Sequence, residues 1–387
     1  MTADALLTGL ALACLIVAAQ PALFAVLNLA LLRTPTPEPD PGPAGSGLVS
    51  ILIPARNEAE RIGPTLAAAL GSTGTPVEVL VGDDHSTDGT AALVRAMAAR
   101  DPRLRLEAVP PLPEGWTGKN NACAYLATRA RGAFLLFIDA DVQLAPEAAA
   151  RLAAQARRGG AGLVSAVPRQ RMDSLGERLT VPMINLLLVG YLPVLAMRRS
   201  LHPSLGAACG QMILATRAAY AETGGHGAIR ASLHDGVRLP RNFRRHGLRT
   251  DLAAGRDLAL CRMYGGFRDA WAGFSKNAHE GMATPRALPV WTALLLLGHV
   301  LPWGLVAAGL LGDLPPAAFA CALAALALSL ATRAAVTLGT GEPAATIPLH
   351  PVIVLTALAI QWNVLLRRER AGAATWKGRS YPVGGAE

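Results

Sequence analysis

The feature that most constrains this chain is the gathering of its apolar residues into long blocks at both ends. No charged residue occurs from Ala5 to Leu32, a run longer than the roughly 20 residues that cross a bilayer. Pro21 lies within this run, where it can kink or divide a helix. A cleaved signal peptide is the alternative, but no basic segment precedes the run and the run is too long. We therefore expect residues 1–33 to be an N-terminal transmembrane anchor.

The chain becomes apolar again after residue 286. Three segments there suit membrane helices: Leu288–Leu311, Ala317–Val336 and Ile347–Leu366. Residues 287–366 are thus predicted to form transmembrane helices, with a basic tail at 367–387. Three full crossings would place this tail opposite a cytoplasmic domain, against the positive-inside tendency. We favour a cytoplasmic tail, which requires one segment to be re-entrant or interfacial.

The formal charge of +9 does not indicate a nucleic-acid partner. The basic residues are scattered and aromatic residues make up only 5%, so no stacking platform accompanies them. We expect anionic lipid headgroups of the bilayer to be the partner of this charge, and no nucleic acid. The five cysteines include no C-x-x-C pair and indicate neither a disulfide framework nor a zinc site.

The middle of the chain is predicted to be an α/β domain. Residues 34–47 are a proline-rich linker, which we expect to hold the next domain off the membrane. Short apolar strands then alternate with helices, which is typical of a largely parallel sheet covered by helices. The expected strands are Val49–Pro54, Val77–Gly82, Leu104–Ala108, Phe134–Ile138 and Leu163–Val167, and the expected helices are Ala59–Leu70, Thr90–Ala99, Asn120–Arg131 and Pro146–Arg157.

A further apolar stretch, residues 179–197, lies inside the soluble part between Arg178 and Arg198. Pro182 and Pro193 make it a poor straight span. We interpret it as an interfacial helix pair in the headgroup zone, with a buried core helix as the alternative.

Polar residues follow three of the predicted strands, where ligands of open parallel sheets bind. Asp139-Ala140-Asp141 comes directly after the strand Phe134–Ile138. Two carboxylates at this spacing suit Mg²⁺ or Mn²⁺, which take hard oxygen ligands and complete their shells with phosphate and water. Asp83 and Asp84 follow the second strand and are suited to accept hydrogen bonds from a nucleobase and ribose.

Four motifs occur in an order that resembles the nucleotide-sugar half of family 2 glycosyltransferases. They are Pro54-Ala-Arg-Asn-Glu58, Asp83-Asp84-His-Ser86-Thr-Asp88-Gly89, Gly118-Lys119-Asn120-Asn121-Ala122 and Asp139-Ala-Asp141. Later motifs resemble the hopene-associated branch and its carotenoid and ceramide glycosyltransferase relatives. These are Gly115-Trp116-Thr117-Gly118-Lys119, Ala208-Cys209-Gly210-Gln211, Gly224-Gly225-His226, His234-Asp235-Gly236 and Trp376-Lys377-Gly378-Arg379. The resemblance implies a Rossmann-like sheet of the glycosyltransferase A type.

The resemblance also implies roles for the residues at the strand ends. The nucleotide of the donor sugar is expected to be UDP. Asp83 and Asp84 would bind base and ribose, and Lys119 would lie on the nucleotide side. Asp141 would be the principal metal ligand, with Asp139 serving the ribose or a metal-bound water. The nucleotide site would further include Pro54, Arg56 and Glu58.

By the same resemblance, Asp235 is the general base that deprotonates the acceptor hydroxyl during a single inverting displacement. The departing diphosphate needs positive charge, for which the candidates are Arg262, Arg268, Trp271 and Lys276. Processive relatives carry Q-x-x-R-W here, whereas this chain has Arg268-Asp-Ala-Trp271, which favours transfer of a single sugar. An amphipathic interfacial helix is the alternative interpretation of this segment.

We therefore expect a metal-dependent inverting glycosyltransferase of the bacterial inner membrane, with its catalytic domain in the cytoplasm. Residues 48–170 would bind the nucleotide-diphosphate sugar, and residues 171–286 would hold the base and the acceptor. The acceptor would be a membrane lipid, with a hopanoid or other polyisoprenoid as first choice and ceramide, diacylglycerol and carotenoid open. The alternatives are a processive polysaccharide synthase and a non-catalytic nucleotide-sugar-binding protein.

Overall fold

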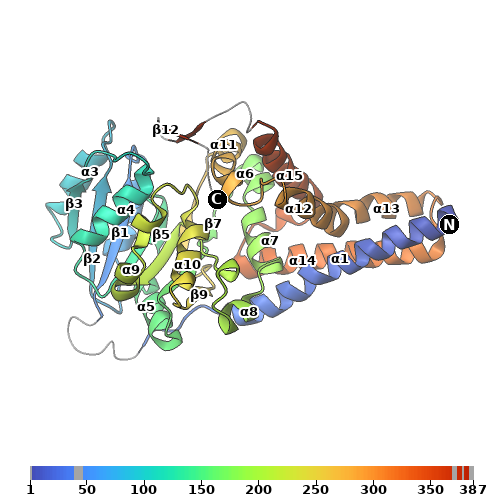
Figure 1. Cartoon of the computed structure of the whole chain (residues 1–387), viewed down its shortest axis with the longest axis horizontal. Helices are drawn as coiled ribbons and strands as arrows, with labels where there is room; N and C mark the ends of the chain where they lie inside the picture. Colours follow the sequence, from blue (N-terminus) through green and yellow to red (C-terminus); the bar gives the residue numbers. More distant parts are fainter. Residues whose placement is uncertain (1, 39–46, 368–372, 377–378, 383–387) are drawn as a thin grey trace.

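The chain folds into an α/β domain at one end and a bundle of long helices at the other (Figure 1). The computed structural model describes residues 2–38, 47–367, 373–376 and 379–382. The N-terminus lies at the tip of the helical bundle that points away from the α/β domain. This arrangement confirms the predicted α/β fold with apolar helices before and after it in the sequence.

The α/β domain is built on a seven-stranded sheet of order β3-β2-β1-β4-β8-β6-β9. Strand β8 runs antiparallel to β4 and β6, and the other neighbouring strands are parallel. The strands are β1 Val49–Ala55, β2 Val77–Asp83, β3 Leu104–Ala108, β4 Phe134–Ile138, β6 Leu163–Ala166, β8 Met212–Thr216 and β9 Thr250–Ala253. The predicted mostly parallel sheet is confirmed, and β8 and β9 are strands that the sequence did not predict.

Helices cover both faces of this sheet, so its central strands are apolar on both sides. Ile51 and Leu136 belong to one buried cluster, and the alternate residues Leu52 and Leu135 belong to the other. All four are at most 1% exposed, and shortening one to alanine would cost about 3 kcal/mol. The helices are α2 Ile62–Leu70, α3 Thr90–Ala98, α4 Gly118–Arg129, α5 Ala148–Gly159, α9 Arg217–Glu222 and α10 Asp235–Arg245.

Shorter elements join the domain to the membrane part. A small sheet of order β5-β10-β7 consists of Val142–Leu144, Ala259–Cys261 and Arg169–Gln170. The connecting helices are α6 Leu175–Thr180, α7 Met183–Gly190, α8 Val194–Arg199 and α11 Phe267–Asn277. The predicted interfacial segment 179–197 is therefore a helix pair, α7 and α8, and α7 packs on α1 and α14.

Within the described residues, four helices are long and apolar enough to cross a membrane. They are α1 Ala3–Leu31, the continuous segment Ala287–Leu310, α14 Pro316–Thr340 and α15 His350–Arg367. The second consists of α12 Ala287–Leu295, the π-helical turn Leu296–Val300 (η4) and α13 Leu301–Leu310. Helix α1 contains Pro21 without being divided there.

These four helices do not all extend to the same end of the molecule. Helices α1, α13 and α14 extend side by side to the far tip, whereas α15 lies beside α11, α6 and α12 near the α/β domain (Figure 1). That one apolar segment is re-entrant or interfacial stays a prediction, and α15 is the segment placed apart from the other three. A hairpin of short strands follows, β11 Ala373–Trp376 and β12 Arg379–Pro382. Apart from Arg367, the basic cluster of the predicted tail lies outside the described residues.

The described part of the proline-rich linker does not separate the domain from the membrane helices. The carbonyl of Arg33 accepts a hydrogen bond from Ala254 N at 3.2 Å. Glu38 pairs with Arg157 of α5 at 2.7 Å. These polar contacts hold the described start of the linker against the domain, and its role as a spacer from the membrane stays a prediction.

Candidate active site

A cavity of about 750 Å³ extends from the carboxyl ends of the strands to the helices of the membrane part. Its polar end is lined by Arg56, Glu58, Asp84, Lys119, Asp139, Asp141, His234, Asp235 and Lys276. Its apolar end is lined by Met183, Ile184, Leu187, Leu188, Phe274, Met282, Ala357 and Ile360. One cavity thus joins a charged region to a hydrocarbon-like one.

The loops after β1 and β2 meet at the polar end. Arg56 Nη1 donates to the carbonyl of Asp84 at 2.6 Å. Asn57 and His85 both have positive φ, 53° and 58°, which non-glycine residues adopt at an energetic cost. These strained turns bring the two loops to the cavity wall.

The two neighbouring acids of the second loop have different surroundings. Asp84 is 3% exposed and lines the cavity. The carboxylate of Asp83 accepts a hydrogen bond from Ser86 N at 3.2 Å within its own loop. Of the predicted nucleotide-binding residues, Pro54, Arg56, Glu58 and Asp84 line the cavity, and Asp83 shapes the loop beside it.

Asp139 and Asp141 follow β4 and both line the cavity. Asp141 Oδ1 is buried and has no hydrogen-bond partner in the described part of the chain. Burial, followed by the negative charges of Asp139 and Glu58, raises the pKa of Asp141 to about 7. The positive charge of Arg61 opposes this rise only in part. A buried carboxylate beside other carboxylates is an environment that a divalent cation would stabilise.

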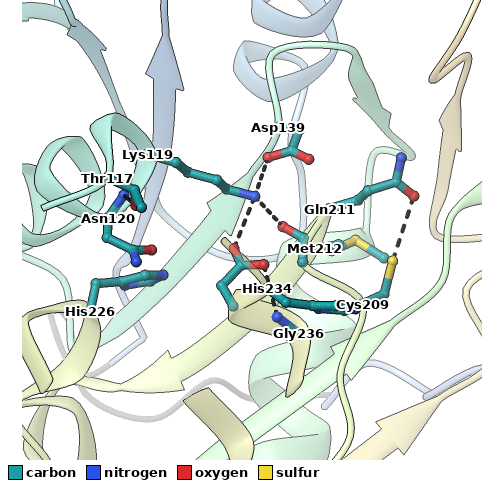
Figure 2. A network of polar contacts seen from close by, with 12 residues as sticks. Thr117, Lys119, Asn120, Asp139, Cys209, Gln211, Met212, His226, His234 and Gly236 are labelled. Carbon is teal, nitrogen blue, oxygen red and sulfur yellow. Dashed lines mark hydrogen bonds and ion pairs between the residues drawn. The ribbon is translucent and has the colours of Figure 1, made fainter. Parts of the chain in front are cut away.

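Lys119 connects Asp139 to the predicted base. Its Nζ lies 2.6 Å from Asp139 Oδ1, 2.9 Å from Asp235 Oδ2 and 3.0 Å from the carbonyl of Gly210. Figure 2 shows the lysine extending from the start of α4 toward Asp139. Burial would lower the pKa of Lys119, but Asp139 and then Asp235 raise it well above its usual value. The lysine therefore stays charged between the two acids.

The position of Lys119 follows from the start of α4. The Thr117 side chain caps the helix by accepting from Asn120 N at 3.4 Å. Asn120 Nδ2 donates to the carbonyls of Ile229 and Ser232, both at 2.8 Å. These bonds tie the first turn of α4 to the segment that precedes Asp235.

Asp235 is the first residue of α10 and is 8% exposed. Burial alone would raise its pKa, but the positive charge of Lys119 leads the opposing contributions and the pKa lies below its usual value. Gly210 is required here because a Cβ at this position would overlap the Asp235 carboxylate. Asp235 is thus an ionised, largely desolvated carboxylate, a state that suits a general base.

Behind the polar end lies a buried polar layer that the sequence did not predict. Gln211 Oε1 accepts from Gln170 Nε2 at 2.8 Å, and Gln211 Nε2 lies 3.0 Å from Cys261 Sγ. Cys209 Sγ lies 3.5 Å from Gln211 Oε1 (Figure 2). Burial, then Asp141, raises the pKa of Cys261 well above its usual value. Cys209 and Gln211 belong to the motif Ala208-Cys209-Gly210-Gln211. This motif was the only sequence signal we noted for these buried polar residues.

The four residues predicted to stabilise the diphosphate are dispersed. Lys276 lines the cavity. Arg262 lies 3.0 Å from Glu177 and 3.2 Å from Asp173. Arg268 is exposed, and Trp271 contacts Phe267 with ring centroids 5.7 Å apart and planes inclined at 44°. Arg262, Arg268 and Trp271 do not line the cavity, so only Lys276 remains a candidate for stabilising the diphosphate.

Comparison with known proteins agrees with this geometry. The sequence profile described as Glycosyl transferase family 2 matches residues 50–224. The 4,4'-diaponeurosporenoate glycosyltransferase of Staphylococcus haemolyticus (strain JCSC1435) is 31% identical over 240 residues, 61% of this chain and 62% of that protein. The protein of the same name from Staphylococcus aureus (strain USA300) is 29% identical over 255 residues, 64% of this chain and 65% of that protein. The matched region spans less than two thirds of either relative.

A solved structure with a similar fold is mannosyltransferase PcManGT from Pyrobaculum calidifontis, determined with GDP-Man and Mn²⁺. It aligns over 94% of this chain and 99% of its own, with a TM-score of 0.55 and 21% identity. At this identity the likeness establishes the fold alone.

Proposed function

Because residues 50–224 form a glycosyl transferase family 2 domain, we propose that the protein transfers one sugar from a nucleotide-diphosphate sugar to a membrane lipid. The observation that carries the proposal is the continuity of the cavity. Its polar end contains Asp141, Lys119 and Asp235, and its apolar end is formed by helices next to the membrane part. A water-soluble donor and a lipid acceptor can therefore meet in one site.

The polar end would bind the donor. Asp84 is positioned to accept hydrogen bonds from the nucleoside, and Asp83 keeps its loop in shape. Asp141, with Asp139 beside it, would hold Mg²⁺ or Mn²⁺, since Asp141 Oδ1 is buried and unpaired in the described structure. No group of three or more His, Cys, Asp or Glu side chains in the described ranges surrounds one metal position. The donor phosphates and water would complete the shell, and the bound ion would neutralise charge on the diphosphate.

Asp235 would act as the general base. It accepts the proton of the acceptor hydroxyl while the hydroxyl oxygen forms a bond to the anomeric carbon. The bond from that carbon to the diphosphate oxygen breaks on the opposite face, so the configuration inverts and the nucleoside diphosphate leaves. Lys276 lines the cavity and is placed to offset the negative charge of the leaving group.

The acceptor is proposed to be a polyisoprenoid lipid with a terminal hydroxyl. The apolar end supplies aliphatic side chains for such a chain. The two relatives are named for 4,4'-diaponeurosporenoate, so they support a lipid-like acceptor, whereas the hydroxyl as the acceptor group is our proposal, since the name of their substrate denotes a carboxylate. A hopanoid and a carotenoid are both compatible with this lining. The cytoplasmic side of the bacterial inner membrane fits a water-soluble nucleotide donor, and an interfacial α15 would leave the basic tail on that side.

The test is transfer by purified full-length protein in detergent. Protein, UDP-sugar, Mn²⁺ and a polyisoprenoid alcohol should give a lipid carrying one sugar, detected by mass spectrometry. Chelation should abolish the product, and Asp257→Asn, a change at an exposed acid outside the cavity, should leave it unchanged. A ladder of longer glycans would contradict single-sugar transfer, and absence of any lipid product with several nucleotide sugars would overturn the proposal.

A further inference from the structure

Helix α7 forms one wall of the apolar end. Met183, Ile184, Leu187 and Leu188 line the cavity. Asn185 lies on the same helix but is 2% exposed and does not line the cavity. The helix has only eight residues and no side-chain cap, and a helix this short is not stable on its own. Its position must therefore be fixed by its neighbours.

Arg333 of α14 holds the start of α7. This arginine is fully buried, and its Nη1 donates to the carbonyl of Pro182, the N-cap of α7, at 3.2 Å. It also forms an ion pair with Glu342. Glu342 Oε1 in turn accepts from Asn185 Nδ2 at 2.7 Å. Arginine and glutamate thus contact α7 at two points one turn apart.

Polar side chains of α1 hold the other end of α7. Asn28 Nδ2 donates to the carbonyls of Val189 at 2.8 Å and Leu192 at 2.7 Å. Gln20 Nε2 donates to the carbonyl of Gly190 at 3.3 Å. Backbone carbonyls at the end of a helix have no partner within the helix, so α1 supplies the bonds that α7 lacks.

A buried ion pair is an expensive way to obtain stability alone, because apolar residues of the same volume usually serve as well. The pair instead fixes the position of α7, because each hydrogen bond requires its donor and its acceptor to lie at one place. In membrane helices, charged residues that face the protein interior also tend to mark functional regions. The bonds of Arg333 and Glu342 end on the helix that lines the cavity.

We propose that Arg333, with Glu342 and Asn185, is a positioning residue that sets α7 at the distance the lipid acceptor requires. This inference rests on the proposed function, because it assigns the apolar end to the acceptor. Displacement of α7 would misplace the acceptor and leave the donor-binding loops after β1, β2 and β4 unaffected.

The test compares full-length protein in detergent with the variants Asn185→Leu, Arg333→Met and Thr332→Val. Thr332 is the matched control: it is 2% exposed, precedes Arg333 in α14, and its hydroxyl donates to Leu328 within its own helix. Asn185→Leu leaves the Arg333–Glu342 pair and the Arg333 bond to the Pro182 carbonyl in place and removes only the link from Glu342 to α7. Amide hydrogen exchange over residues 183–190, donor affinity, and KM and kcat for the lipid alcohol are measured.

We expect faster exchange in residues 183–190 for Asn185→Leu and Arg333→Met, with the α/β domain unchanged. KM for the lipid should rise on the order of tenfold, with kcat within about twofold and donor affinity unchanged. Arg333→Lys, which keeps the charge, should recover part of the affinity. Thr332→Val should match the wild type in every measurement.

Unchanged exchange over 183–190 in both variants, or a loss of donor affinity equal to the loss for the lipid, would overturn the positioning role. Failure of the proposed function is a separate outcome, because wild-type protein would then transfer no sugar to lipid while the exchange results still report whether Arg333 holds α7.

Discussion

The polar end and the apolar end of the cavity are built in different ways. At the polar end, Asp84, Asp141 and Lys119 each come from a short motif directly after a strand or at the start of a helix. At the apolar end, α7 is held by Asn28 from one end of the chain and Arg333 from the other. Local motifs thus place the charged groups, and contacts between residues 151 to 164 positions apart in the sequence place the apolar wall.

This difference predicts two separable sets of variants. Changes at the polar end should act on kcat and on donor or metal binding. Changes at the apolar end should act on KM for the lipid. The predictions below run from the largest expected effect to the smallest.

The largest loss is expected from Asp235→Asn. The amide cannot accept the acceptor proton, so kcat should fall by about 10³-fold, while nucleotide-sugar affinity stays near the wild-type value. Initial rates with saturating donor and isothermal titration of the donor check the two parts. If Asp235→Asn kept full transfer, the base would have to be another residue.

A smaller loss, about 10²-fold in kcat, is expected from Lys119→Met. In the wild type, Lys119 keeps the pKa of Asp235 below its usual value. Without this charge, burial dominates and the pKa of Asp235 rises, so the acid limb of the kcat profile should move to higher pH. A pH–rate profile of both proteins measures the shift. An acid limb at the same pH in both would show that Lys119 does not control this carboxylate.

Metal affinity should depend on pH through Asp141. The metal binds the ionised carboxylate, and the pKa of Asp141 without metal is about 7. Below that pH the ionised fraction drops, so the apparent Mn²⁺ affinity should weaken by up to about tenfold per pH unit and level off above pH 8. Titration of Mn²⁺ at several pH values tests this. Asp141→Asn should bind Mn²⁺ weakly at every pH, and a flat wild-type profile would contradict the assignment.

The smallest effect is expected at the apolar end. Leu187→Ala removes aliphatic surface from the cavity wall, so KM for the lipid should rise about fivefold with kcat and donor affinity unchanged. Leu195→Ala is a suitable control, since Leu195 is 41% exposed and outside the cavity lining. An equal effect of Leu187→Ala on the donor would remove the distinction between the two ends.

The sequence predicted the polar end better than the apolar end for a physical reason. Strands such as Phe134–Ile138 are continuous apolar runs, and the acids that follow them must lie at the sheet edge. The partners of a buried polar side chain are not encoded nearby: Asn185 and Glu342 are 157 positions apart. The same limit applies to Arg262. We predicted that it would stabilise the diphosphate, and in the structure it pairs with Glu177, which is distant in the sequence.

The antiparallel strand β8 shows a second limit. Met212–Thr216 is a five-residue apolar run that enters the sheet between β4 and β6. The local sequence of such a run does not indicate which strands it will pair with. Its place in the sheet brings Gly210 against the Asp235 carboxylate and the Gln211 carbonyl within 3.2 Å of Asp139 N, so this unpredicted strand supports the residues that were predicted.

The attachment of α7 to both α1 and α14 has a consequence for the order in which a nascent chain matures. Helix α1 is made before α7, but its Asn28 finds its partners only after residue 192 has been made, and the contact from Arg333 comes later still. The strands that carry Asp84 and Asp141 are complete long before that point. A growing chain should therefore become able to hold a nucleotide sugar before it can receive a lipid, which delays transfer until the last helices have entered the membrane.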